Sequence, residues 1–327
     1  MKPLLARLEH YWFAPRPEFN LGVFRTLVGL WLLYTWFARL APRLRASVDR
    51  PPELALPPTL LHWLGLPVPV PETAVNVAQW VFPALALLLV VGLFTRPVLA
   101  LVTLLFLWFE GSHNSWGYTS HSTILPALIL VILCFAPGVQ RLSLDARRDP
   151  TLSAEPPSVW PVRLALLLVA LVYLGSGLSK LRYSGLSWLD GETLAFYLSG
   201  GSPRGVGSLQ GFIADSGLSE AARFRDGFGL VDYTWVANPP SFARRLAEIP
   251  WLMKVSSGAV LLLELGFPLA LWNRRAMIAF LTLAAVFHLG VYALMGIDFM
   301  AYLVSYCLFV DWRWLEARAL RRAAPSA

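Results

Sequence analysis

Long apolar runs, separated by short polar segments, dominate the pattern of residues along the chain. An α-helix needs about 20 apolar residues to cross a bilayer core about 30 Å thick. The pattern therefore predicts eight membrane-spanning helices, near residues 19–41, 74–94, 97–112, 121–137, 161–181, 253–272, 275–295 and 297–312. The third, fourth and eighth of these are short. The expected fold class is an all-α, polytopic integral membrane helix bundle.

One long polar segment, residues 182–252, interrupts the series of apolar runs. It is rich in Gly, Ser and Pro, yet it carries more Trp, Phe and Tyr than a flexible linker would. We interpret it as a partly ordered cap on the non-cytoplasmic face, inserted into a single membrane domain that covers residues 1–327.

The composition agrees with a membrane protein. Of the 327 residues, 57% are hydrophobic and only 14% are charged, which is outside the usual range of water-soluble domains. A net charge of +7 could otherwise suggest nucleic-acid binding, but here the arginines lie at the ends of apolar runs. They act there as topology signals. We expect membrane lipids as partners and no nucleic acid.

Basic residues in the short loops predict the orientation, because positive charge is retained on the cytoplasmic side. The segments before helix one and after helices two, four, six and eight carry Lys or Arg, whereas the loops after helices three and seven carry neither. Arg43, Arg45 and Arg50, after helix one, favour the opposite orientation. The balance predicts a multi-pass protein of the bacterial inner (plasma) membrane with both termini in the cytoplasm.

Ionisable residues inside the apolar runs are the candidates for a functional site. A charge at the bilayer centre costs roughly 2.5 to 3.5 kcal/mol on insertion scales unless it is paired or neutralised. Glu264, midway along helix six, and His288, inside helix seven, are too deep to reach the surface easily, so we expect a site or a buried pair there. Lys180 ends helix five, where an anchor at the membrane surface and a reactive amine are equally compatible with the sequence.

Arg25 lies one to two turns inside helix one, near its cytoplasmic end. Its long side chain can extend much of the way to the membrane surface, or it can bind a lipid phosphate or a carboxylate. The sequence leaves these alternatives open.

Other kinds of site find no starting motif. The chain contains no nucleotide-binding, zinc-protease or hydrolase signature, and the spacing of its histidines and acids indicates no metal site. Its two cysteines, Cys134 and Cys307, both lie inside apolar runs and form neither a CxxC motif nor a disulfide framework.

Four stretches resemble, in order, the horizontally transferred transmembrane (HTTM) family, whose best known member is the vitamin K-dependent gamma-carboxylase. They are FNLGVFRTLVG in helix one, SWGYTSHSTIL entering helix four, SGLSKL with WLDG after helix five, and LLLELG with FHLGVYALMGIDFMAY near the end. Together they span most of residues 19–312.

The resemblance implies an enzyme that uses vitamin K hydroquinone, menaquinol or a related lipid. In the carboxylase a lysine at the position of Lys180 is the base that deprotonates the hydroquinone, and a histidine matching His121 takes part in the chemistry. The resemblance also implies a catalytic role for His288, which matches the FH of the penultimate helix. It further implies cofactor-binding roles for Glu264, where the carboxylase has an acid, and for Arg25, Trp188 and Asp190 in the matching stretches.

The chain also departs from the carboxylase. One lysine stands where the carboxylase has two, and the large luminal domain that holds its protein substrate is missing, which argues against carboxylation of a propeptide-bearing protein. Three hypotheses therefore stay open: an enzyme that uses a membrane quinone with Lys180 as base, a non-catalytic transporter or assembly partner of a membrane or exported protein, and an accessory that resembles DoxX-type quinone-linked proteins.

Overall fold

The computed structural model describes residues 2–14, 21–116, 121–153, 158–199, 201–205, 224–226, 229–235 and 240–312. In this part of the chain helices predominate, and six of them are long and apolar enough to cross a membrane. The predicted all-α, polytopic membrane fold is confirmed.

The eight predicted helices all form, but they differ in length. The six candidate spans are Leu21–Ser47, Glu72–Val91, Thr95–His113, Trp160–Tyr183, Pro250–Leu271 and Arg274–Met295. The predicted fourth and eighth helices are the shorter apolar helices Ile124–Phe135 and Met300–Phe309. The expected count of eight is thus six full spans and two shorter helices among the described residues.

Several of these spans are built from more than one element. The first consists of α2 (Leu21–Thr35), a π-helical turn η1 (Trp36–Leu40) and α3 (Ala41–Ser47). The others are α5 (Glu72–Val91), α6 (Thr95–His113), α7 (Ile124–Phe135), α9 (Trp160–Tyr183), α13 (Pro250–Gly266) with η8 (Phe267–Leu271), α14 (Arg274–Met295), and α15 (Met300–Tyr306) with η9 (Cys307–Phe309). The helix α1 (Lys2–Phe13) precedes them. Short helices lie between them: η2 (Pro52–Leu54), α4 (Thr59–Trp63), η3 (His121–Thr123), α8 (Leu144–Arg148) and η4 (Pro150–Ser153).

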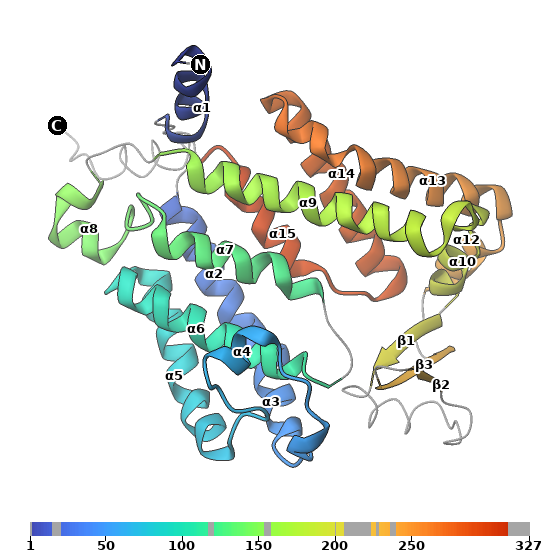
Figure 1. Ribbon diagram of the computed structural model, residues 1–327, viewed down its shortest axis with the longest axis horizontal. Helices are drawn as coiled ribbons and strands as arrows, with labels where there is room; N and C mark the ends of the chain where they lie inside the picture. The colour runs from blue at the N-terminus through green and yellow to red at the C-terminus, as the bar shows by residue number, and fades with distance from the viewer. Residues whose placement is uncertain are drawn as a thin grey trace.

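The bundle has two halves that share one hydrophobic core. Helix α2 packs against α5, which packs against α6, while α9 packs against α13 and η8 (Figure 1). Helices α7 and α15 join the halves, since α7 contacts both α6 and α9, and α15 contacts α2, α7 and α14. Large apolar side chains such as Leu262 and Val286 remain 74% and 64% exposed, as expected for helix faces that contact lipid.

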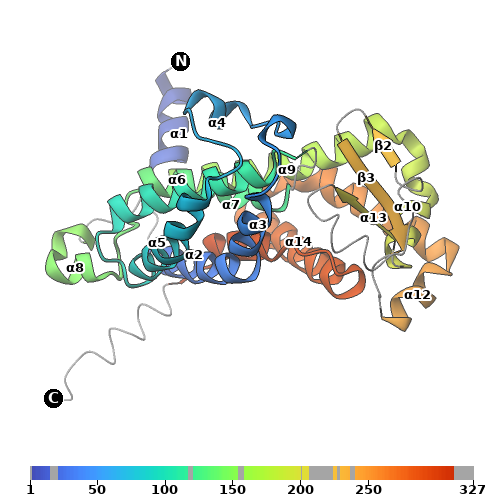
Figure 2. The ribbon, with the colours of Figure 1, turned by 90° about the horizontal axis from the view of Figure 1, so that it is seen from below.

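The structure describes part of the polar segment 182–252. Its described elements are η5 (Gly185–Asp190), α10 (Glu192–Leu198), β1 (Gly201–Gly205), β2 (Phe224–Asp226), β3 (Gly229–Trp235) and α12 (Ser241–Ala247). The strands form an antiparallel sheet in the order β1-β3-β2, which the sequence pattern did not predict. Figure 2 shows this sheet at one end of the molecule, next to α10, which β1 contacts. Leu198, Ala243 and Met253 form a small core there, separate from the main one.

Side-chain contacts to backbone groups fix the opposite end of the bundle. Arg96 donates to the carbonyls of Cys134 and Ala136, both at 2.8 Å, and so binds the free carbonyls at the end of α7. The carboxylate of Asp145 accepts the amides of Phe94 (2.9 Å) and Thr95 (2.7 Å), where α6 begins. Burial alone would raise the pKa of Asp145, but these hydrogen bonds outweigh it and hold that pKa below its ordinary value.

Candidate functional site

A cavity of about 200 Å³ lies between α9, α13 and α14, next to η5 and α10. Most of its wall is apolar, with Val172, Val260 and Phe287 among the lining residues. Four residues singled out from the sequence meet in this cavity: Lys180, Trp188, Glu264 and His288. The sequence placed them on three different apolar runs and on the segment after helix five.

The SGLSKL stretch brings Lys180 to this position. Gly177 faces α13 so closely that a Cβ there would lie 2.9 Å from Leu265 Cδ2 and 3.1 Å from Glu264 Cβ. A residue three positions later is on the same face of a helix, so Lys180 also faces α13. The absence of a side chain at Gly177 therefore lets the two helices approach at the level of the lysine and the acid.

Lys180 and Glu264 form an ion pair. Nζ of Lys180 lies 2.7 Å from Oε1 of Glu264, with side-chain exposures of 22% and 6%. The second oxygen, Oε2, is buried and has no hydrogen-bond partner among the described residues. We expected Glu264 to be paired or protonated, and the structure shows that it is paired. Its second oxygen stays available to accept a proton or a hydrogen bond.

Trp188 covers the ammonium of Lys180 from the other side. Its ring lies 4.9 Å from Nζ, within the range of a cation–π contact. Its indole N–H donates to the carbonyl of Ser257 at 3.3 Å, which fixes η5 to α13. The amine is thus held between an acid on one helix and an aromatic face on a connecting segment.

His288 is the first member of a buried hydrogen-bonded chain. Its Nε2 lies 2.8 Å from the hydroxyl of Tyr173, which lies 2.7 Å from the hydroxyl of Tyr306. Phe267 stacks on Tyr173 with ring centroids 4.3 Å apart. Each hydroxyl can both donate and accept, so this chain can carry a proton away from the cavity or toward it.

Asp190 and Gly191, in WLDG, have structural contacts outside the cavity. The Asp190 carboxylate accepts the amide of Glu192 at 2.8 Å, at the start of α10, and its side chain is exposed. Gly191 has φ of 82°, and a Cβ there would lie 2.7 Å from the backbone of Met253. The stretch therefore turns the chain tightly against α13 and so positions Trp188. Asp190 does not line the cavity, and its binding role stays a prediction.

Arg25 lies apart from this cavity and does not line it. Its side chain is fully buried, and Nη2 donates to the carbonyl of Leu142 at 3.1 Å and to that of Val90 at 3.5 Å. A Cβ at Gly92 would collide with its guanidinium. Arg25 thus connects α2 to the end of α5 and to the loop before α8. A role in binding a cofactor stays a prediction for this residue too.

His121 begins η3, but its side chain lies outside the described part of the structure. Its neighbour Thr123 donates to Oε2 of the buried Glu110 at 3.0 Å. Arg39, on the π-helical turn η1, forms an ion pair with Asp298 at 3.1 Å. The first contact joins η3 to α6, and the second joins η1 to the segment before α15. None of the four residues that make these contacts lines the Lys180 cavity.

Sequence reasoning missed the tyrosines of the site, Tyr173, Tyr302 and Tyr306. Tyrosines in a membrane protein usually lie in the interfacial belts, and these three were not distinguished from that group. A signal was present for one of them. Tyr173 precedes Lys180 by seven residues, which places both on one face of α9.

A protein-family model for the HTTM domain matches residues 13–202, more than half of the chain. This range contains Lys180 and Trp188, while Glu264 and His288 follow it. No match was found among curated proteins or among solved structures.

Proposed function

The chain belongs to the HTTM domain family, and on that premise we propose that it is a membrane enzyme acting with a quinone, such as vitamin K or menaquinone, or with a related lipid. The observation that carries the proposal is the shared cavity of Lys180, Glu264 and His288. Ionisable side chains inside a membrane domain are costly, and by default they indicate a functional site.

The cavity fits the ring of such a lipid better than its tail. Ligand pockets for whole drug-sized molecules range from about 300 to 1,000 Å³. A volume of about 200 Å³ is below this range, so a ring can enter while an isoprenoid chain stays between the helices or in the bilayer. Apolar and aromatic walls suit such a ring, and Oε2 of Glu264 can accept a hydrogen bond from a hydroquinone hydroxyl. His288 lines the same cavity.

When bound, a hydroquinone supplies a phenolic proton and two electrons. The protein's part is to accept that proton, and the Lys180–Glu264 ion pair is the group that accepts it. If the ammonium proton of Lys180 crosses the 2.7 Å contact to Oε1 of Glu264, a neutral amine remains at the cavity and can take the phenolic proton. Because the two groups share their protons, the pair acts as one base.

The chain of His288, Tyr173 and Tyr306 offers a second route for protons. A proton that arrives at His288 can be passed to Tyr173 and from there to Tyr306, since each hydroxyl donates one proton as it accepts another. His288 would in this way assist Lys180, and His121 remains a further candidate in the same role.

The same contacts also favour a second candidate, a non-catalytic membrane module. Lys180 and Glu264 neutralise each other, and Tyr173 bonds to both of its polar neighbours, which is what a structural polar network requires. Such a module would be a transporter or an assembly partner of a membrane or exported protein.

Quinone binding separates these candidates. We would purify the protein in mild detergent, before and after adding menaquinone, and identify bound quinones by mass spectrometry. Val260→Trp, which fills the cavity, should abolish the signal, whereas Val255→Trp, on the exposed face of the same helix, should keep it. Extracts without quinone in every case would favour the non-catalytic module.

For its location, we propose the bacterial inner membrane with both termini in the cytoplasm and segment 182–252 as a cap on the opposite side. Two exposed positions at opposite ends of the bundle test this, Arg275 and Ser187. In a variant without Cys134 and Cys307, a cysteine at position 187 should react with an impermeant reagent in intact cells, and one at position 275 should react only after permeabilisation. The reverse result would invert the arrangement.

A further inference from the structure

A second cavity, of about 330 Å³, lies at the end of α9 opposite to Lys180. Its walls come from the end of α1, the first turns of α9, and the junction between η8 and α14. The lining residues with polar groups are Tyr11, Arg163, Trp272, Asn273 and Arg274, and no acidic side chain is among the described residues that line it. The cavity is therefore a positively charged site at the ends of membrane-spanning helices.

Arg163 is the central cation of this cavity. Its guanidinium carbon lies 3.5 Å from the ring centroid of Tyr11, so the aromatic ring of α1 fixes its position. Its Nε is buried without a hydrogen-bond partner, and Arg163 forms no ion pair within the described part of the chain. A cation that is held in place but not neutralised attracts an anionic ligand from outside the protein.

Arg274 adds a second charge from the other side. It forms an ion pair with Asp311 at 3.2 Å, in which Arg274 remains 54% exposed and can still contact a ligand. Helices α9 and α14 both begin at this cavity, so the positive ends of two helix dipoles add to the two arginines. Among the described residues, Asp311 is the only acid that forms an ion pair with either arginine.

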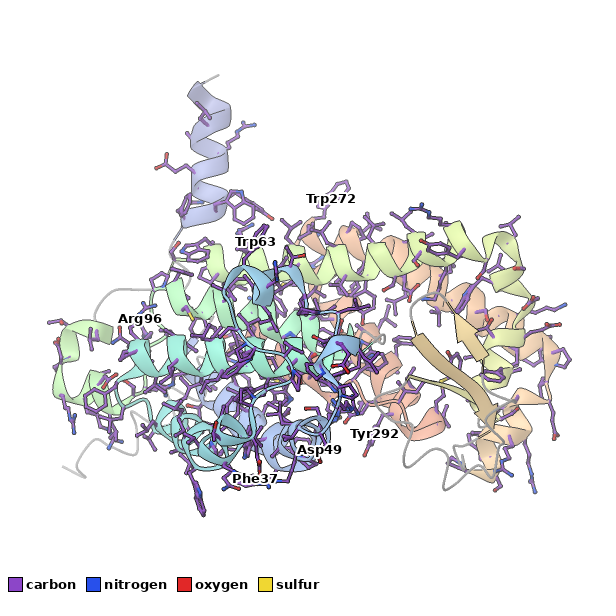
Figure 3. The ribbon with its side chains drawn as sticks, turned by 60° about the horizontal axis from the view of Figure 1, so that its bottom comes forward. Phe37, Asp49, Trp63, Arg96, Trp272 and Tyr292 are labelled. Carbon is purple, nitrogen blue, oxygen red and sulfur yellow. The ribbon has the colours of Figure 1, made fainter. Side chains whose placement is uncertain are left out.

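The surroundings favour a lipid over a small soluble anion. Val162, Leu166 and Met277 form an apolar wall beneath the arginines, where an acyl chain can lie. Trp272 is 81% exposed and projects away from the bundle (Figure 3), as tryptophans do at the level of lipid headgroups.

We propose that this cavity binds the phosphate of an anionic membrane lipid, with Arg163 and Arg274 as its ligands. Basic pockets between transmembrane helices bind such headgroups in general. The phosphate occupies the space between the two guanidinium groups, and the acyl chains follow the apolar wall into the bilayer. This site is independent of the quinone cavity, because no residue lines both.

The test measures binding of defined lipids to the purified full-length protein in mild detergent. Dioctanoyl phosphatidylglycerol should bind, dioctanoyl phosphatidylcholine should bind much more weakly, and inorganic phosphate alone should not compete at the same concentration. Arg163→Gln and Arg274→Gln should each weaken phosphatidylglycerol binding by about fivefold, the expected worth of one basic residue near anionic lipid.

Arg275→Gln is the matched control, since Arg275 is exposed, adjacent in sequence and not part of the lining. It should leave binding unchanged. Arg274→Gln changes an exposed side chain and should fold, so the test does not depend on the more buried Arg163. The proposal would be overturned if the two lipids bound equally well, or if inorganic phosphate competed at the same concentration as the lipid. Equal effects of all three substitutions would also overturn it.

Discussion

Two cations buried in this membrane domain have different surroundings. Arg25 is fully buried, donates to the carbonyl of Leu142 and packs against Gly92. Lys180 is 22% exposed, pairs with Glu264 and lines a cavity. In the sequence both are single charges near the end of an apolar run. The surroundings therefore distinguish the two cations. Arg25 connects backbone segments, whereas Lys180 lies at a cavity where we propose proton exchange and ligand binding.

The largest expected effect concerns the acid beside Lys180. Glu264→Lys would place two cations in contact, and breaking a buried pair costs about 3–5 kcal/mol. We expect this variant to lose its folded state. Glu264→Gln keeps an oxygen that can accept from Lys180 and should fold. Expression and thermal unfolding in mild detergent would measure both, and equal stability of the two variants would show that Glu264 is not buried against Lys180.

Removing the other cation should weaken the fold without affecting the cavity. Arg25→Met removes the donor to the carbonyl of Leu142, whereas the carbonyl of Val90 still accepts from the hydroxyl of Thr26 at 3.3 Å. A hydrogen bond from a charged group contributes about 1.5–3 kcal/mol. The melting temperature should fall, while quinone binding by the remaining folded protein should persist. The control is Arg45→Met, because Arg45 donates to Gln79 at the exposed surface. If Arg25→Met abolished quinone binding but not stability, Arg25 would belong to the site.

Two glycines on α9 provide a smaller and more local test. Gly177→Ala places a methyl group against Leu265 and should push α9 away from α13, at a cost of about 1–3 kcal/mol. Gly175→Ala meets nothing within 4 Å and should stabilise the helix slightly. Thermal unfolding compares them. Equal melting temperatures of the two variants would contradict the close packing of α9 against α13 that brings Lys180 to Glu264.

The smallest expected effect is a pH dependence at the opposite end of the bundle. The pKa of Asp145 is held below its ordinary value of 3.8 by the amides of Thr95 and Phe94. Its contribution to stability is therefore present above that ordinary value and is lost as the pH falls through the lower, folded-state value. Asp145→Asn should lower the melting temperature at neutral pH, and the difference from wild type should shrink in strong acid. A difference that stayed constant with pH would contradict this assignment.

The length of the apolar runs was sufficient to locate all eight hydrophobic helices, because a chain inside the membrane must satisfy its own backbone hydrogen bonds and forms a helix there. It did not reveal the strands β1, β2 and β3. For β3 a signal was present, since its residues VDYTW alternate between apolar and polar, as in a strand. The strands β1 and β2 show no such alternation. Length was also misleading in part, since the helices near 121–137 and 297–312 are interrupted or shortened in the structure.

The site was predictable where charge was conspicuous. Lys180, Glu264 and His288 stand out in apolar runs, and the structure brings them together. Arg25 stands out equally but is bonded to carbonyls, and no sequence pattern reports which backbone groups lie nearby. Tyr173 and Tyr306 were missed because a tyrosine is amphipathic and equally compatible with the core, the interface and a site.

Replacement of Lys180 by arginine tests the central proposal most directly. Arginine keeps the positive charge and can still pair with Glu264, but it does not give up its proton. In liposomes supplied with menaquinol and equilibrated with air, so that dioxygen can take up the two electrons, we would measure the rate of menaquinol oxidation. The proteins compared are wild type, Lys180→Arg and the control Lys254→Arg, which changes an exposed lysine on α13. If the Lys180–Glu264 pair is the base, Lys180→Arg folds and binds quinone but loses turnover, while Lys254→Arg retains it. Full turnover in Lys180→Arg would show that Lys180 is only a structural cation.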